Sequence, residues 1–103
     1  MSRSSDIEIN FQAAQRQATE LEVIADNMRH LAEQQMADAV QGISSCWRGE
    51  SAAAYLVKAE KVRQDIADTA KELYETASSI RAQAKRIYDA EMQAIALAQS
   101  EIK

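Results

Sequence analysis

The segment that decides the fold is Gln41-Gly42-Ile43-Ser44-Ser45-Cys46-Trp47-Arg48-Gly49-Glu50-Ser51, which holds both glycines of a chain without proline. Glycine and serine clusters of this kind end one helix and begin the next. We expect a turn over about residues 43–50, with Gly42 in the left-handed conformation that ends the first helix. Glu50 then lies near the positive N-terminal end of the second helix, where a carboxylate is stabilised.

The sequence before this turn has the spacing of one helical face. Asn10 is a suitable N-cap, and we expect a helix over about residues 10–42. The Ser5-x-x-Glu8 spacing also fits a capping box, so an earlier start stays open. The apolar residues recur at intervals of three and four, at Ala14, Ala18, Leu21, Ile24/Ala25, Met28, Leu31/Ala32, Met36, Ala39/Val40 and Ile43.

The sequence after the turn carries a seven-residue repeat, which predicts a helix over about residues 51–98 that supercoils with a partner helix. The repeat places its residues in two rows of the seam. The first row is wholly apolar and consists of Ala52, Ala59, Ile66, Leu73, Ile80, Ile87 and Ala94. The second row is mixed and consists of Tyr55, Val62, Thr69, Thr76 and Gln83 in its first part.

Composition supports an all-α fold. The 103 residues are 47% hydrophobic and 27% charged, and the regularly spaced turn signals of a sheet protein are lacking. We predict one domain over residues 1–103, an antiparallel two-helix hairpin with a Trp-X-Gly turn. Because two helices bury little surface, we expect two hairpins to pair as a dimer in a four-helix bundle. The residues expected in the hairpin and dimer seam are Leu21, Ile24, Met28, Leu31, Val62, Ile66, Leu73, Ile80 and Ile87.

Charge and hydropathy exclude two classes of partner. The net charge is −4 and the basic residues are dispersed, which argues against binding of nucleic acid. The longest apolar run, residues 52–57, is far shorter than the ~20 residues that span a bilayer, so we expect no integral membrane segment. The first residues lack the apolar core of a signal peptide, and we expect a protein made in the cytoplasm without a Sec-type signal.

No residue pattern indicates catalysis, a metal or another cofactor. His30 is the single histidine, with Asp26 and Glu33 on the same helical face. The matching Glu and His ligands of a di-metal bundle are missing, so we interpret His30 as a surface residue. Glycine-rich phosphate loops and nucleophile–histidine sets are lacking as well. Cys46, the single cysteine, cannot form an internal disulfide. We therefore predict a protein that is not an enzyme.

Trp47 is the residue that most needs an explanation, because a tryptophan in a serine-rich turn is costly to leave in water. It either caps the end of the hairpin core or forms an exposed aromatic anchor for a partner protein. Gly49 would allow the tight turn that brings the indole to the helix junction.

Trp47-Arg48-Gly49, central in a chain of about one hundred residues between two long helices, resembles the WXG (Trp-X-Gly) family of ESAT-six-like proteins. These are small substrates of the bacterial type VII (ESX) secretion system. The resemblance implies a helical hairpin that dimerises with itself, with a related small protein or with the helical N-terminus of a toxin, and that is exported through a membrane ATPase complex. It gives Trp47 and Gly49 the role of the turn motif in the export signal.

The second half of that signal departs from the family pattern, which is a tyrosine followed four residues later by an acid. Tyr88 lies in the right region, but Met92 stands four residues later. Glu91 lies near Tyr88 on a helix surface, so the pair can form a variant signal. The departure leaves three hypotheses open: a secreted effector, an accessory or chaperone-like partner of a larger toxin, and a cytosolic coiled-coil adaptor. The sequence distinguishes neither a homodimer from a heterodimer nor one partner from another.

Overall fold

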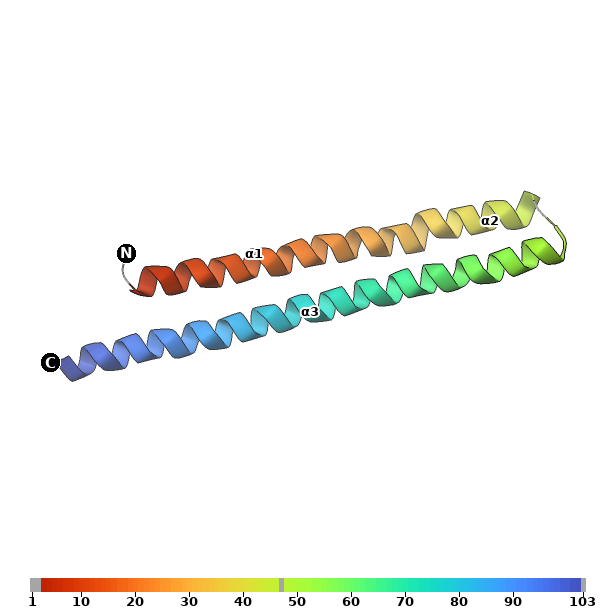
Figure 1. Ribbon diagram of the computed structural model, residues 1–103. Helices are drawn as coiled ribbons and strands as arrows, with labels where there is room; N and C mark the ends of the chain where they lie inside the picture. Colours follow the sequence, from red (N-terminus) through yellow and green to blue (C-terminus); the bar gives the residue numbers. More distant parts are fainter. Residues whose placement is uncertain (1–2, 47, 103) are drawn as a thin grey trace. The chain divides into compact units, whose positions relative to one another are not determined.

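The computed structural model describes residues 3–46 and 48–102, and all regular structure in these ranges is helical. The first arm consists of α1 (Arg3–His30), a π-helical turn η1 (Leu31–Gln35) and α2 (Met36–Cys46). The second arm is α3 (Glu50–Ile102), as Figure 1 shows. The all-α class and the arrangement of two helical arms joined by a short turn are thereby confirmed.

The helices extend beyond the bounds expected from their caps. α1 begins at Arg3 rather than near Asn10, and Ile7 in its added turn is buried. Gly42 does not end the first arm, since α2 continues to Cys46 and the positive φ angle falls on Gly49. Apolar packing of Ile7 accounts for the earlier start of α1, and the left-handed conformation of Gly49 places the turn after Cys46.

The chain divides into two compact units. The terminal unit combines Met1–Leu21 with Glu75–Lys103, and the turn unit is Glu22–Tyr74. α1 and α3 each contribute to both units. Each unit therefore consists of one segment of the first arm packed on one segment of the second.

The arms of the terminal unit run antiparallel. Phe11 contacts Tyr88, whereas Gln15 and Thr19, farther along α1, contact the earlier residue Arg81. The buried residues in the described part of this unit are Ile7, Ala18 and Ala77.

The arms of the turn unit are also antiparallel. Asp26 contacts Tyr74, and Met36 shares a hollow with the earlier α3 residue Ala59. Among the residues of this unit that the structure describes, the buried ones are all alanines, at Ala25, Ala32, Ala52 and Ala70. Alanine allows close approach of two helices but removes little apolar surface from water.

The seam of α3 uses one of the two rows expected from the sequence. Residues of the apolar row from Ala52 to Ile80 are buried or half-buried. The mixed row is exposed. Beside the apolar row, the seam instead contains the row of residues on its other side. That second seam row consists of Leu56, Arg63, Ala70, Ala77 and Ala84.

The π turn corrects a break in the heptad spacing of the first arm. The less exposed residues Met28, Ala32, Met36 and Val40 follow one another at intervals of four, without the usual alternation with three. In η1 the Met36 N–H group donates to the Leu31 carbonyl, five residues back. Because a π turn closes its hydrogen bond one residue later than an α turn, it keeps these residues on one face.

Candidate functional site

The turn between the arms depends on Gly49. Its φ angle is 108°, a region that residues with a Cβ rarely adopt. Its carbonyl accepts a hydrogen bond of 3.1 Å from the Ala53 N–H group, the first helical bond of α3, and Glu50 lies in the first turn. Gly49 thus sets the direction in which α3 leaves the turn. Trp47, the other predicted residue of the motif, lies outside the described residues.

Two serine hydroxyls near the end of α2 bond back to the helix backbone. Ser44 Oγ donates to the Gln41 carbonyl at 3.0 Å, and Ser45 Oγ donates to the Gly42 carbonyl at 2.9 Å. Each bond runs from a serine hydroxyl to the carbonyl three residues earlier, so both hydroxyls find their acceptor within the helix itself. Cys46, the last residue of α2, is exposed.

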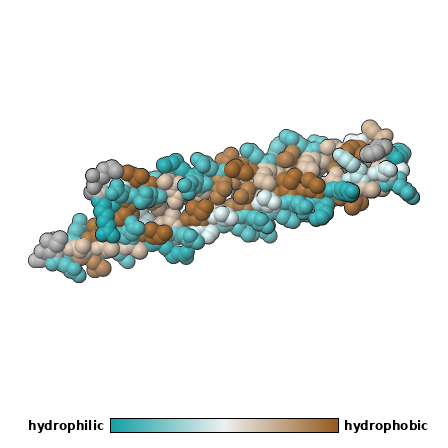
Figure 2. All heavy atoms as spheres, viewed as in Figure 1, coloured by the Kyte–Doolittle hydropathy of each residue, from teal (hydrophilic) through white to brown (hydrophobic). Residues whose placement is uncertain are grey.

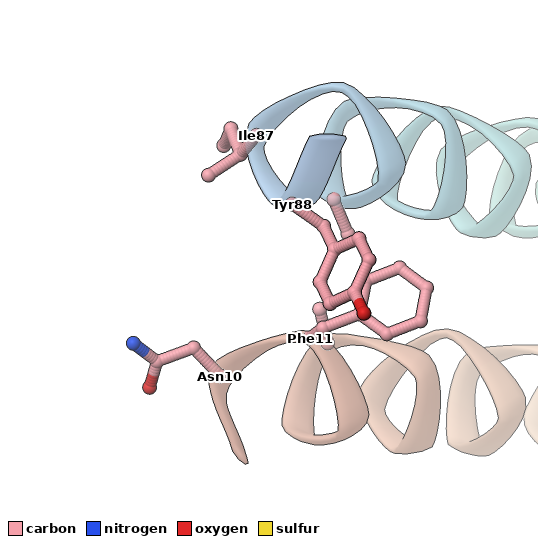
Figure 3. A pocket seen from close by; sticks show the side chains of 6 residues that line it. Asn10, Phe11, Ile87 and Tyr88 are labelled. Carbon is pink, nitrogen blue, oxygen red and sulfur yellow. The ribbon is translucent and has the colours of Figure 1, made fainter. Parts of the chain in front are cut away.

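Tyr88 packs against α1 in the terminal unit. Its ring centroid lies 4.8 Å from that of Phe11, with 41° between the ring planes. Figure 3 shows the two rings side by side between the helices, while Ile87 and Asn10 point away from them. Glu8 accepts a hydrogen bond from the Tyr88 hydroxyl, which raises the pKa of Tyr88 above its usual value. The geometry thus gives Tyr88 a packing role.

The residues after Tyr88 do not form a cluster of carboxylates around it. Glu91, the acid predicted for a variant export signal, is half-buried, as is Met92. Asp89 is exposed and pairs with Lys85 at 3.1 Å. In this region, therefore, Lys85 and Asp89 form an exposed ion pair, whereas the residues of the predicted signal, Tyr88 and Glu91, are half-buried.

One side of the turn unit, which we call the polar flank, is closed by contacts between the arms. The Tyr74 hydroxyl donates to the Asp26 carboxylate, and this bond raises the pKa of Tyr74. The Arg29 guanidinium lies 5.8 Å from the centre of the Tyr74 ring, a cation–π contact. Earlier in α3, Arg63 pairs with Glu60, and the negative charge of Glu33 on the first arm also helps to raise the pKa of Arg63.

The opposite side of the turn unit is apolar and exposed. We call it the apolar flank and define it by Ile24, Leu31, Tyr55 and Val62, which are 48%, 37%, 50% and 50% exposed. At 3.6 residues per turn, Ile24 points about 140° away from Arg29 around α1. The same geometry puts Val62 about 160° away from Glu60 around α3. Figure 2 shows apolar side chains of the chain reaching the surface among hydrophilic ones.

The apolar flank contains a hollow to which both arms contribute. It measures about 270 Å³ and is lined by Met36, Tyr55, Lys58, Ala59 and Val62. Lys58 is the charged residue of this lining, and the stem of a lysine side chain packs as apolar surface. An aliphatic side chain is the ligand that such a hollow fits best.

The nine residues predicted for the hairpin and dimer seam fall into two groups. Leu21, Met28, Ile66, Leu73 and Ile80 are half-buried between the arms. Ile24, Leu31, Val62 and Ile87 are exposed in the single chain. The sequence pattern missed the polar flank, although the aromatic residue Tyr74 and the acid Asp26 were its visible signals.

The described part of the chain holds no candidate metal site. Within residues 3–46 and 48–102, no group of three or more His, Cys, Asp and Glu side chains is placed to hold a metal ion. Asp26, considered with His30 and Glu33 as a ligand set, instead contacts Tyr74 and lies 4.0 Å from Arg29. None of the described helices combines the length and the apolar composition that a bilayer span requires.

Comparison of the chain with protein-family models, with curated proteins and with solved structures finds no match. The candidate features are therefore defined by the residues of this chain alone: the glycine turn and the exposed apolar flank of the turn unit, and the packed tyrosine of the terminal unit.

Proposed function

We propose that this chain is a small non-enzymatic protein that acts as a dimer through protein–protein contacts. The observation that carries the proposal is the composition of its core. In the described residues the buried apolar side chains are Ile7 and six alanines, whereas Ile24, Leu31 and Val62 are exposed. A chain that leaves its large aliphatic side chains in water gains stability by covering them with a partner.

The exposed area supports the same proposal. The chain exposes 7543 Å², whereas a folded monomer of 11.4 kDa exposes about 5,800 Å². The excess of about 1,700 Å² falls within the roughly 1,000–2,500 Å² that each chain buries in an obligate dimer.

We further propose that the protein is a substrate or effector of a type VII secretion system. The support is the resemblance of Trp47-Arg48-Gly49 to the Trp-X-Gly turn motif, together with the left-handed conformation of Gly49 between two helical arms. Its partners would be a second copy or a related helical chain, and the secretion ATPase complex.

An accessory role beside a larger toxin is the second candidate. The observation that favours it is the state of the second half of the signal. The Tyr88 hydroxyl is engaged by Glu8, and Met92 occupies the position of the expected acid. A partner that carries an intact signal would then direct export of the pair.

An export assay tests the secretion proposal. The chain is expressed in a bacterium with an active type VII system, and culture supernatants are compared for wild type, Trp47→Arg and the surface control Val57→Arg. We expect wild type and Val57→Arg outside the cells and Trp47→Arg retained, with helical circular dichroism unchanged. Equal export of folded Trp47→Arg would overturn the role of the turn motif. Export of wild type only when a partner gene is present would favour the accessory role.

A further inference from the structure

We infer that the apolar flank of the turn unit is the surface on which a second copy of this chain docks. The inference rests on the proposed function as a dimer and names its interface: Ile24 and Leu31 of the first arm, Val62 of α3, and the hollow to which both arms contribute. The polar flank takes no part in it.

The two flanks differ in whether their side chains already make contacts between the arms of the same chain. On the polar flank, Asp26 and Arg29 engage Tyr74. A partner docking there would break these contacts and remove charged groups from water, which is costly. On the apolar flank, exposed Ile24, Leu31 and Val62 gain from being covered. The balance of these costs directs association to one side of the turn unit.

A second copy fits this flank because the flank carries both halves of a self-complementary contact. A twofold interface requires each protomer to present the same patch, with projections that match hollows elsewhere on it. Ile24 and Leu31 project from the first arm, and the hollow beside Met36, Ala59 and Val62 receives an aliphatic side chain. The whole chain, of which this flank is a part, exposes about 1,700 Å² more than a typical monomer, which is enough surface for an interface of this kind.

Two exposed valines of α3 provide a matched test. Val62 lies on the apolar flank, and Val57 is 71% exposed and points about 140° away from it. We compare wild type, Val62→Arg and Val57→Arg by sedimentation equilibrium, with circular dichroism as a check on folding. Val62→Arg should raise the dimer dissociation constant by about 100-fold, because a buried guanidinium at the interface has no partner. Val57→Arg should change it by less than about threefold.

A second pair on the first arm makes the test independent of the folding of one variant. Ile24→Lys should weaken the dimer, whereas Val23→Lys, at an exposed neighbouring position, should not. If wild type is a dimer that both Val62→Arg and Ile24→Lys leave intact, the interface is elsewhere and this inference fails while the proposed dimer stands. If wild type is a monomer at all concentrations, the proposed self-association fails as well.

Discussion

The hydroxyl group of Tyr74 on α3 donates a hydrogen bond to the carboxylate of Asp26 on α1. Tyr88 makes the equivalent contact with Glu8 in the terminal unit. In each unit, therefore, a tyrosine of the second arm is held by an acid of the first. Both contacts need the neutral tyrosine, because a tyrosinate has no proton to donate and repels the carboxylate.

These two bonds make the stability of the chain depend on pH in the alkaline range. They raise the pKa of Tyr74 and Tyr88 above the usual 10.0. As the pH rises above 10, the unfolded chain loses these protons before the folded chain does. The stabilisation is present in full below pH 10 and is lost as the pH approaches the raised pKa values. Thermal melts from pH 8 to 11 should show this decrease.

The substitution Asp26→Ala isolates one of the two bonds. Without the carboxylate, the pKa of Tyr74 should return toward 10.0, which an ultraviolet titration of tyrosinate in a Tyr55→Phe/Tyr88→Phe background measures directly. An unchanged titration curve after the substitution would show that the Asp26 contact does not set this pKa.

The two glycines should respond in opposite directions to replacement by alanine. Gly42 is inside α2 with open space where a Cβ would be, so Gly42→Ala should stabilise the fold by about 0.5–1 kcal/mol. Gly49 has open space too, but its φ angle of 108° is strained for alanine, and Gly49→Ala should cost about 1–3 kcal/mol. Urea denaturation of both variants measures the difference. Destabilisation by Gly42→Ala would contradict the helical conformation at this position.

Deletion of one residue tests the function of the π turn. Removing Gln34 changes the spacing from Ala32 to Met36 from four to three, which restores the alternation that a regular α-helix supports. The variant should keep a cooperative melt. Removing Asn27 from the regular part of α1 moves Met28 and all later seam residues to another face, and its melting temperature should fall by roughly 10 °C or more. Equal losses in both deletions would show that η1 has no corrective role.

Periodicity alone predicted much of the fold. Steps of three and four indicated two helical arms, and the row containing Ala59 and Ile66 lies between the arms as expected. The choice between the rows on either side of it could not be made from one helix. Val62 is more hydrophobic than Arg63 in the competing row, yet Arg63 lies in the seam because its long side chain reaches Glu60 at the edge.

The candidate site was less accessible to sequence analysis. The glycine turn was predicted from composition, but only the backbone angle distinguishes Gly49 from Gly42. Three successive intervals of four residues between Met28 and Val40 indicate an irregular turn. The sequence analysis did not predict this turn, because a seven-residue repeat also contains intervals of four. The polar flank forms between residues of opposite arms, such as Asp26 and Tyr74. The periodicity of one helix does not show which residues of the other arm lie beside it.

The measurement that tests the central claim most directly is the mass of the purified protein by light scattering across a dilution series, with a thermal melt at each concentration. The claim is that one chain leaves an apolar flank that a second copy covers. It predicts a species near twice 11.4 kDa whose melting temperature rises with concentration. A stable 11.4 kDa monomer with a melting temperature independent of concentration would contradict it.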